Sequence, residues 1–331
     1  MNFIGIEPQL RALGFTGSLN DMLFEYFTGD GALNDRMSTW LATKGFVVGT
    51  LNDKWYAYLG SLGYTGALND RFFKWVLEPT NPIMAATGGD VTIDGDYKIH
   101  TFNTDGTFSV TAGGLMDVLC VGGGGGAGFS NINHYHGGGG GASLPVQMFS
   151  NFTPGDYAVV VGVGGDAGYN LAAQGLNGGD STINSLVSQG GGGGGGSPGT
   201  TTANPNTYGK SGGNGGGGGA VAPGAGVSVG GSPLGAGYAG ADGTDNNSGW
   251  GGGGGGAGGA APAPTGLGSA GGDGIISSIT GATVTYCSGG IAGGTASVAN
   301  TGPGSGGNGK ILNVVAHPGV NGVVIVRYKF Q

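Results

Sequence analysis

The chain has 331 residues, of which 85 are glycine and only 9% are charged, whereas soluble globular proteins average ~7% glycine and ~25% charged residues. Its net charge of −8 comes without any cluster of Lys and Arg, which argues against nucleic-acid binding and against attachment to an anionic membrane. Two cysteines are too few for a disulfide framework, and no apolar stretch approaches the ~20 residues of a membrane-spanning helix.

The first 80 residues contain four copies of the tripeptide Leu-Asn-Asp and are predicted to form an α-helical domain. Each copy follows a glycine and a small residue, and it precedes an aromatic-rich stretch with helical spacing. Ser18 and Thr50, each with an aspartate three residues later, resemble capping boxes that use Asp in place of Glu. We expect four short helices, with a lead-in helix over residues 8–13. The residues expected to cap these helices are Ser18, Asp21, Asp35, Thr50, Asp53 and Asp70.

The repeated Asn-Asp pairs leave two interpretations open. In the simpler one, the helices pack their aromatic faces together as a small bundle, because helices of ~11 residues are not stable alone. In the alternative, the pairs form a calcium site. Calcium loops take several oxygen ligands from about a dozen residues, and one Asn-Asp pair per turn does not supply them, so the bundle is favoured.

From residue 90 the helical spacing gives way to the alternation of β-strands, after a Pro- and Gly-containing linker at residues 81–89. We therefore expect an α+β chain in which a helical domain, residues 1–80, precedes a jelly-roll-like β-sandwich, residues 90–331. Asp94-Gly95 and Asp105-Gly106 are predicted to be hairpin turns. Strands are predicted at residues 91–93, 97–102, 107–110, 116–121, 156–163 and 320–330.

Runs of consecutive glycines interrupt this domain, and we expect them to be packed backbone rather than flexible tethers. Glycine does not recur at every third position, which excludes collagen. A tether would join two finished domains, whereas these runs lie between strands of one domain. A left-handed extended helix with three residues per turn has no internal hydrogen bonds, so it is free to bond to neighbours of the same kind. Polyglycine II helices stacked at one end of the sandwich are therefore predicted. The runs are residues 122–126, 137–141, 190–196, 215–219 and 251–256.

Several of these segments resemble a glycine-rich domain of tailed-bacteriophage tail-fibre and minor virion proteins. The similar parts are residues 97–110, the strand-to-glycine junction at 116–128, Gly-Gly-Asp-Ser-Thr at 178–182, and the closing strand at 322–328. The glycine runs also look like those of phage tail-tip adhesins that recognise outer-membrane proteins, and residues 63–71 look like short helical segments of phage structural proteins. The resemblance implies a virion component that binds the host.

Under this interpretation, residues 1–80 anchor the protein to other virion proteins of the tail or head. The partner at the other end is a bacterial surface receptor, either an outer-membrane protein or a glycan. No secretory signal is found at residues 1–5, so synthesis in the host cytoplasm followed by assembly into the virion is expected, without membrane insertion or nucleic-acid binding. A homotrimer is compatible with a fibre, although no heptads specify one. A head-decoration or head-fibre protein is the alternative.

Catalysis is not expected. Any glycine-rich chain generates Gly-x-Gly-x-x-Gly matches, so these do not indicate a dinucleotide site, and no cofactor is predicted. A glycosidase needs a pair of carboxylates about 5–10 Å apart, but the acids of the glycine-rich domain are mostly aspartates in turn sequences. Cys120 lies in an apolar strand and is predicted to be buried, and Cys287 has no base nearby in sequence. The turn aspartates are Asp94, Asp105, Asp156, Asp166, Asp180, Asp242 and Asp273.

Residues that interrupt the glycine runs are the candidates for receptor contact. Exposed aromatic rings give contact area at low entropy cost, and amides give adaptable hydrogen bonds. His134 and His136 leave three alternatives open, namely a metal site at a threefold axis, a receptor-contacting loop or an ordinary loop, and no metal is predicted. The rings could instead cap the ends of the glycine stack. The contact candidates are His134, Tyr135, His136, Tyr169, Tyr208, Tyr238, Asn246, Asn247 and Trp250.

Overall fold

The chain folds as two compact units, Met1–Pro82 and Ile83–Gln331. The structure, a computed structural model, describes residues 32–45, 47–61, 84–130, 135–169, 173–198, 205–245, 249–265, 268–293, 300–309 and 316–330. In these ranges strands greatly outnumber helices, so the described fold is mostly β. Strand β1 (Ala85–Thr87) pairs with β4 (Gly106–Ala112). The linker predicted at residues 81–89 is therefore too long, because residues 85–87 belong to a sheet.

The described part of the first unit contains helices α3 (Leu33–Thr43) and α4 (Leu51–Ser61). Thr50 and Asp53 form the predicted capping box: the Thr50 N–H and hydroxyl donate to Asp53 Oδ2 at 2.9 and 2.6 Å, and the Asp53 N–H donates to Thr50 Oγ1 at 3.2 Å. These hydrogen bonds from Thr50 lower the pKa of Asp53.

The capping prediction is wrong for α3, where the N-cap residue is Ala32. Alanine has no hydroxyl to complete a capping box with Asp35, which is left as the acidic residue of the first turn. Ser18, Asp21 and Asp70 lie outside the described residues. The other helices of the predicted bundle lie there too.

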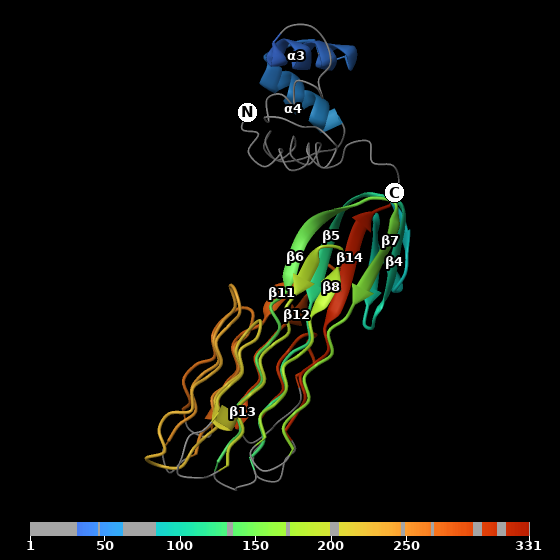
Figure 1. Cartoon of the computed structure of the whole chain (residues 1–331). Coiled ribbons are helices and arrows are strands. Elements are labelled where there is room, and N and C mark those ends of the chain that lie inside the picture. The colour runs from blue at the N-terminus through green and yellow to red at the C-terminus, as the bar shows by residue number, and fades with distance from the viewer. Residues whose placement is uncertain are drawn as a thin grey trace. The chain divides into compact units, whose positions relative to one another are not determined.

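In the second unit, two five-stranded antiparallel sheets pack face to face as a β-sandwich (Figure 1). One sheet has the strand order β1-β4-β7-β8-β9 and the other β2-β3-β14-β5-β6. Both contribute to one core, whose fully buried side chains include Phe108, Phe152 and Tyr328. Bounds of the remaining strands in the two sheets are β2 (Asp90–Asp94), β3 (Tyr97–Phe102), β5 (Gly114–Val121), β6 (Val146–Phe152), β7 (Gly155–Val160), β8 (Ser181–Ile183), β9 (Leu186–Ser188) and β14 (Val323–Lys329).

The strand order differs from the predicted jelly roll. Strands β2 and β3, β5 and β6, and β8 and β9 are sequence neighbours that pair within one sheet, whereas a jelly roll places most successive strands in opposite sheets. Asp94-Gly95 is the predicted hairpin turn between β2 and β3. Asp105-Gly106 is not a hairpin turn, because β3 and β4 lie in different sheets. Asp105 Oδ1 instead accepts a hydrogen bond from the Val161 N–H at 2.8 Å.

A short hairpin of β11 (Ile275–Ser277) and β12 (Val284–Tyr286) covers part of the outer face of the β2-β3-β14-β5-β6 sheet. Ile279, between the two strands, is buried there against Leu119 and Ile325. The remaining described elements are the two-stranded pair β10 (Gly268–Ser269) and β13 (Ala292–Gly293), and the one-turn helix η1 (Pro205–Thr207).

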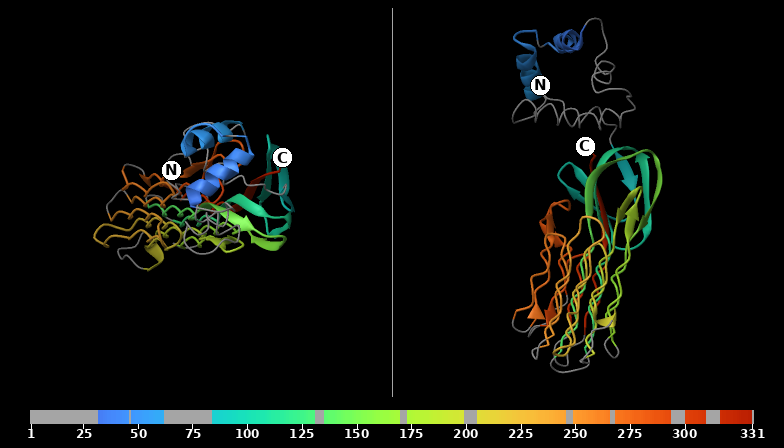
Figure 2. Two further views of the ribbon diagram at one scale, coloured as in Figure 1. Left: turned by 90° about the horizontal axis from the view of Figure 1, so that it is seen from above. Right: turned by 60° about the vertical axis from the view of Figure 1, so that its left-hand side comes forward.

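Beyond the sandwich, extended segments run side by side in a stack (Figures 1 and 2). Strands β5, β7 and β9 lead directly into this stack, β8 and β14 follow directly from it, and β6 follows after two residues. We call it the glycine stack. It comprises residues 122–129, 136–143, 161–169, 173–180, 189–197, 206–222, 227–244, 249–257, 268–274, 287–293, 302–309 and 316–322.

Residues 122–129 show how the stack is bonded. Every third N–H points to the same neighbour, because an extended helix of this type turns once in three residues. Three neighbours therefore receive its N–H groups, and other neighbours donate to its carbonyl groups. On one side the N–H groups of Gly123, Gly126 and Phe129 donate to the carbonyls of Gly179, Leu176 and Ala173. On a second side those of Gly124 and Ala127 donate to Val320 and His317. On the third side those of Gly125 and Gly128 donate to Gly141 and Gly138, and all seven distances are 2.8 to 3.1 Å.

This pattern shows that the described glycine runs are packed backbone, bonded with the three-residue period expected of polyglycine II helices. It also explains the composition, since a side chain added inside the stack would meet a neighbouring backbone. A Cβ on Gly194 would lie 2.1 Å from the carbonyl oxygen of Gly138, and one on Gly254 would lie 1.9 Å from that of Gly140. The stack extends beyond the glycine runs, because segments such as residues 316–320 join it through their backbone hydrogen bonds.

Two buried serines join the sheet ladder to the stack. Ser181 Oγ donates to the Val121 carbonyl at 2.7 Å and accepts from the Gly162 N–H at 2.8 Å. Ser188 Oγ donates to the Leu144 carbonyl at 2.8 Å and accepts from the Gly122 N–H at 2.8 Å. Buried backbone N–H and carbonyl groups need hydrogen-bond partners. At the junction between the sheet and the stack, these two hydroxyl groups provide such partners.

His100 lies between the two sheets in a buried hydrogen-bond network. Its Nδ1 donates to the Gly88 carbonyl at 2.7 Å, so in the neutral ring Nε2 accepts from the Tyr328 hydroxyl at 3.1 Å. The Tyr328 oxygen in turn accepts from the Ala86 N–H at 3.0 Å. Burial lowers the pKa of His100, and Lys98 lowers it further, against the opposing effect of the bond to Gly88.

This depressed pKa predicts a loss of stability in mild acid. The stabilisation that neutral His100 provides is complete above the pKa of the unfolded chain, about 6.5, and is lost as the pH falls through the lower pKa of the folded protein. We expect the melting temperature to fall between pH 7.5 and 5. The decrease should be smaller in His100→Gln, which does not titrate, and equal decreases in the two proteins would contradict the prediction.

Candidate functional site

The end of the glycine stack farther from the sandwich is the first candidate site, and we call it the distal face. Hydrogen bonds between segments place several residues at one level there. The His136 N–H donates to the Gly249 carbonyl, the Ala220 N–H donates to the His136 carbonyl, and the Ser197 N–H donates to the Phe129 carbonyl, at 2.9 Å each. Residues far apart in sequence are thus brought to one level of the stack by its hydrogen-bond register.

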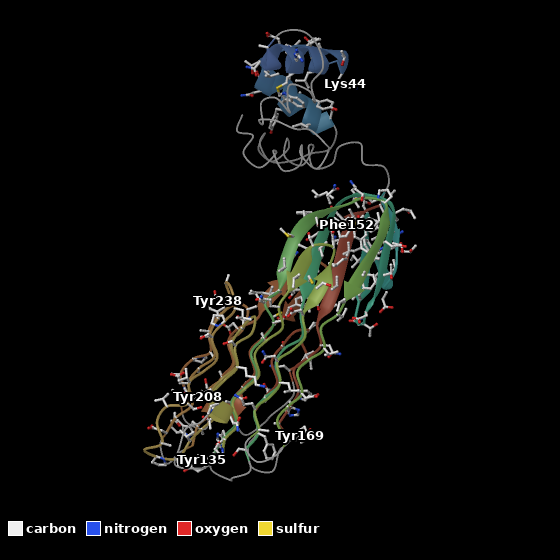
Figure 3. The ribbon with its side chains drawn as sticks, viewed as in Figure 1. Lys44, Tyr135, Phe152, Tyr169, Tyr208 and Tyr238 are labelled. Atoms are coloured by element: carbon white, nitrogen blue, oxygen red, sulfur yellow. The ribbon has the colours of Figure 1, made fainter. Side chains whose placement is uncertain are left out.

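Three predicted contact residues lie toward this face. Tyr135, Tyr169 and Tyr208 are in the half of the stack away from the sandwich, whereas Tyr238 lies nearer the sandwich (Figure 3). Tyr169 is 75% exposed and Tyr208 is 38% exposed, and Tyr135 is half-buried. Three of the four tyrosines therefore lie in the half of the stack away from the sandwich. It leaves Tyr238, which is 41% exposed, on the side of the stack.

His136 is a correction to the predicted contact set. Only 6% of it is exposed, because its backbone is bonded into the stack on both sides. Trp250 is half-buried beside Thr244, whose hydroxyl accepts from the Trp250 N–H at 2.9 Å. His134, Asn246 and Asn247 lie outside the described residues. Within the described ranges, no group of three or more His, Cys, Asp or Glu side chains is placed to hold a metal ion.

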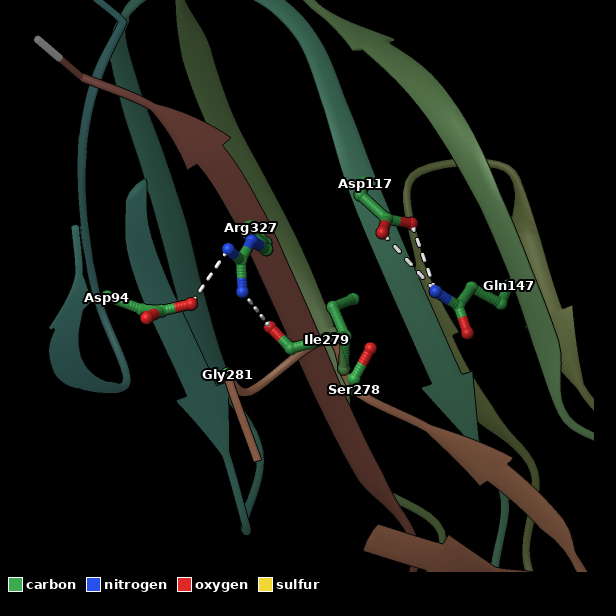
Figure 4. A pocket seen from close by; sticks show the side chains of 7 residues that line it. All are labelled: Asp94, Asp117, Gln147, Ser278, Ile279, Gly281 and Arg327. Carbon is green, nitrogen blue, oxygen red and sulfur yellow. Dashed lines mark hydrogen bonds and ion pairs between the residues drawn. The ribbon is translucent and has the colours of Figure 1, made fainter. Parts of the chain in front are cut away.

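A second candidate site is a cavity of about 310 Å³ on the outer face of the β2-β3-β14-β5-β6 sheet (Figure 4). One wall is the guanidinium of Arg327, which forms an ion pair with Asp94 at 2.8 Å and donates to the Ile279 carbonyl at 3.1 Å. The other wall is Asp117, whose two carboxyl oxygens accept from Gln147 Nε2 at 3.5 and 3.3 Å. The segment between β11 and β12 closes one side through Ser278, Ile279 and Gly281.

Neighbouring residues fix the positions of the Arg327 and Gln147 side chains in this cavity. Arg327 stacks on the ring of Tyr97, with 4.2 Å between its guanidinium carbon and the ring centroid. Gln147 Oε1 accepts from the Ser277 hydroxyl at 3.0 Å. Burial raises the pKa of Asp117, against the opposing effects of the Gln147 hydrogen bond and of Arg327.

Sequence reasoning missed this site and assigned Asp94 to a turn. The signal was the alternation in strands β5 and β14, where Asp117 and Arg327 replace apolar residues on the outer face. Pairing of the strands in space is needed to see that these two positions face each other. Other predicted turn aspartates bind backbone N–H groups at the edges of the stack: Asp180 accepts from Gly190 at 2.8 Å and Asp242 accepts from Gly230 at 2.7 Å.

The two thiols are buried. Cys120 faces the sandwich core as predicted, and its Sγ donates to the Ser181 carbonyl at 3.3 Å. Cys287 lies 3.2 Å from the Ser143 hydroxyl. Burial raises the pKa of each thiol to about 12. Since the thiolate is the reactive form, neither thiol is poised as a nucleophile at neutral pH. No helix in the described ranges has the length and apolar character needed to cross a membrane.

Comparison with known proteins supports the class of domain. Residues 101–329 match the family model described as a glycine-rich domain. The match covers β4 to β14, and so most of the sandwich and the whole stack. The chain therefore belongs to this glycine-rich domain family. No curated protein matches it significantly.

Proposed function

We propose that this protein is a non-enzymatic virion component of a tailed bacteriophage, a tail-fibre or tail-tip adhesin that binds a receptor on the host surface. The observation that carries the proposal is that Tyr135, Tyr169 and Tyr208 lie in the half of the stack away from the sandwich, with Tyr169 and Tyr208 exposed. A stack of hydrogen-bonded backbone is a rigid support for such rings. The sequence resemblance to phage adhesins supplies the biological context.

The side chains of the distal face suit recognition rather than catalysis. Tyrosine rings contribute large contact areas with few rotatable bonds, which makes them effective anchors in binding surfaces. Among the described residues that we assign to this face, His136 is buried, and the three tyrosines are not paired with a base in any hydrogen bond described above. The receptor proposed is an outer-membrane protein or a glycan. In this proposal residues 1–80 attach the protein to other virion proteins.

The test measures binding of the purified protein to host cells. We expect Tyr169→Ala combined with Tyr135→Ala to weaken binding at least about tenfold, a change that losing one or two anchoring rings commonly produces. Ile276→Ala is the matched control, because Ile276 is 70% exposed on the β11–β12 hairpin, away from this face. Normal adsorption of particles that lack the protein would rule the adhesin out.

A head-decoration or head-fibre protein is the second candidate, and the rigid glycine stack also favours it. A rigid, weakly charged stack is also suited to a structural or weakly adhesive projection from a capsid. Immunogold labelling of particles separates the two, since gold on the tail supports the adhesin and gold on the head supports the decoration protein. Copies that lack residues 1–80 should be missing from particles in both cases.

A further inference from the structure

We propose that the cavity between Asp117 and Arg327 binds a neutral saccharide ring through two neighbouring hydroxyl groups. This site is separate from the distal face, and it does not depend on the proposed function. The inference rests on three observations, namely the hydrogen-bonding groups of the cavity, the exposed ring of Phe149 opposite Asp117 on the neighbouring strand, and the size of the cavity.

The two walls offer complementary hydrogen-bonding groups. Asp117 and Arg327 are directly opposite each other on the paired strands β5 and β14. Arg327 nevertheless turns its guanidinium toward Asp94, and Asp117 is bonded to Gln147, so the space between them is left open (Figure 4). Asp117 keeps free acceptor sites, because a carboxyl group has about four. The Gln147 amide, at long distance, and the Val118 backbone N–H do not fill them.

Arg327 likewise keeps free donors. A guanidinium has five N–H groups, and the bonds to Asp94 and to the Ile279 carbonyl use two of them. A hydroxyl group both donates and accepts, so two adjacent hydroxyls can donate to Asp117 and accept from Arg327 at the same time. The Asp94–Arg327 pair is neutral, which leaves no excess positive charge to select a phosphate or a carboxylate. The chemistry of the cavity thus favours a neutral diol.

Phe149 provides the apolar surface that a sugar ring needs. It lies directly opposite Asp117 in the pairing of β5 with β6, and directly opposite residues of an antiparallel pair share one face of the sheet. The Phe149 side chain is 61% exposed. One face of a pyranose ring consists of C–H groups that pack on an aromatic ring. A ligand bonded to Asp117 would therefore lie within reach of Phe149.

The size of the cavity restricts the ligand. Its volume of about 310 Å³ is at the lower limit of small-molecule sites, ~300–1,000 Å³, and suits one sugar ring rather than an oligosaccharide. The support from Tyr97, Asp94 and Gln147 holds the polar groups in place before any ligand binds. Such preorganisation reduces the entropy cost of binding.

The test is titration of the full-length protein with the methyl glycosides of glucose, galactose, mannose and N-acetylglucosamine, followed by NMR or calorimetry. We expect at least one glycoside to bind with a Kd in the millimolar range or below. Asp117→Asn and Phe149→Ala should each weaken that binding about tenfold or more, because they remove an acceptor and the apolar platform.

Two variants are matched controls. Asp156→Asn changes an exposed aspartate of β7 in the other sheet, and Val187→Ala shortens an exposed side chain of β9 in that same sheet. Both should keep the wild-type affinity. The proposal is overturned if no glycoside binds at concentrations up to about 20 mM, well above a millimolar Kd, or if Asp117→Asn and Phe149→Ala bind normally. If Tyr169→Ala alone lost saccharide binding, the saccharide site would be the distal face, and the proposal for the cavity would be wrong. Cell binding that depends on Tyr169 would stand in each case.

Discussion

Replacing Gly125 with alanine should unfold or grossly destabilise the glycine stack. Gly125 is bonded on both sides, since its N–H donates to Gly141 and its carbonyl accepts from Gly307, at 2.8 Å each. A Cβ at this position would lie 2.1 Å from the carbonyl oxygen of Gly192, far inside van der Waals contact. The obstacle is backbone, so no side chain can rotate to make room.

The expected loss is about 3 kcal/mol or more, at the upper end of what overpacking costs. For a unit of this size it corresponds to a decrease of roughly 6–12 °C in melting temperature. Calorimetry of the purified protein measures it. Gly259→Ala is the matched control, because a Cβ there meets no atom within 4 Å, and it should melt close to the wild type. If Gly125→Ala has the same melting temperature as the control, the stack can accommodate the added methyl group and the prediction is wrong.

Replacing Phe108 with alanine should have the second large effect, this time in the sandwich. Phe108 is completely buried. Its ring makes edge-to-face contacts with His100, Phe102 and Phe152, at centroid distances of 5.2, 6.3 and 5.5 Å. All three belong to strands β3 and β6 of the sheet opposite Phe108, which lies on β4, so truncation leaves a cavity where the two sheets meet.

We expect a loss of about 3–5 kcal/mol, the usual range for Phe→Ala in a core. Denaturant unfolding measures it, with Val187→Ala on β9 as the control. Val187 is 50% exposed, and exposed substitutions usually stay within about 0.5 kcal/mol. Because β5, β7 and β9 continue into the stack, the glycine segments should unfold in the same transition. A separate transition for the stack would contradict that coupling.

The two substitutions test different kinds of packing. In the sandwich the apolar side chains of two sheets exclude water, and the free energy scales with the apolar area that they bury. In the stack few side chains are present, and the segments are held together by backbone hydrogen bonds, to which weak C–H···O interactions between neighbouring backbones add. Substitution of Gly125 is therefore destabilising because it adds atoms, whereas substitution of Phe108 is destabilising because it removes them.

Local signals in the sequence were sufficient for several elements. Alternation placed β3, a nearly continuous apolar run placed β5, and high β propensity placed β14, each close to its observed bounds. The same argument failed for β8 and β9, which are three residues each and too short to show a period. The Thr50–Asp53 capping box was also visible, because both partners lie within one helical turn.

The sequence by itself determined that the glycine runs had to pack as backbone, since they lie between strands of one domain in a chain with little charge. Only the tertiary structure decided which segments touch, and therefore that His136 is buried and Tyr169 exposed, and that Asp117 faces Arg327 across an open cavity. The physical reason is that glycine carries no side-chain pattern from which register can be inferred. Hydrogen bonds between distant segments set that register, and they leave no trace in local sequence.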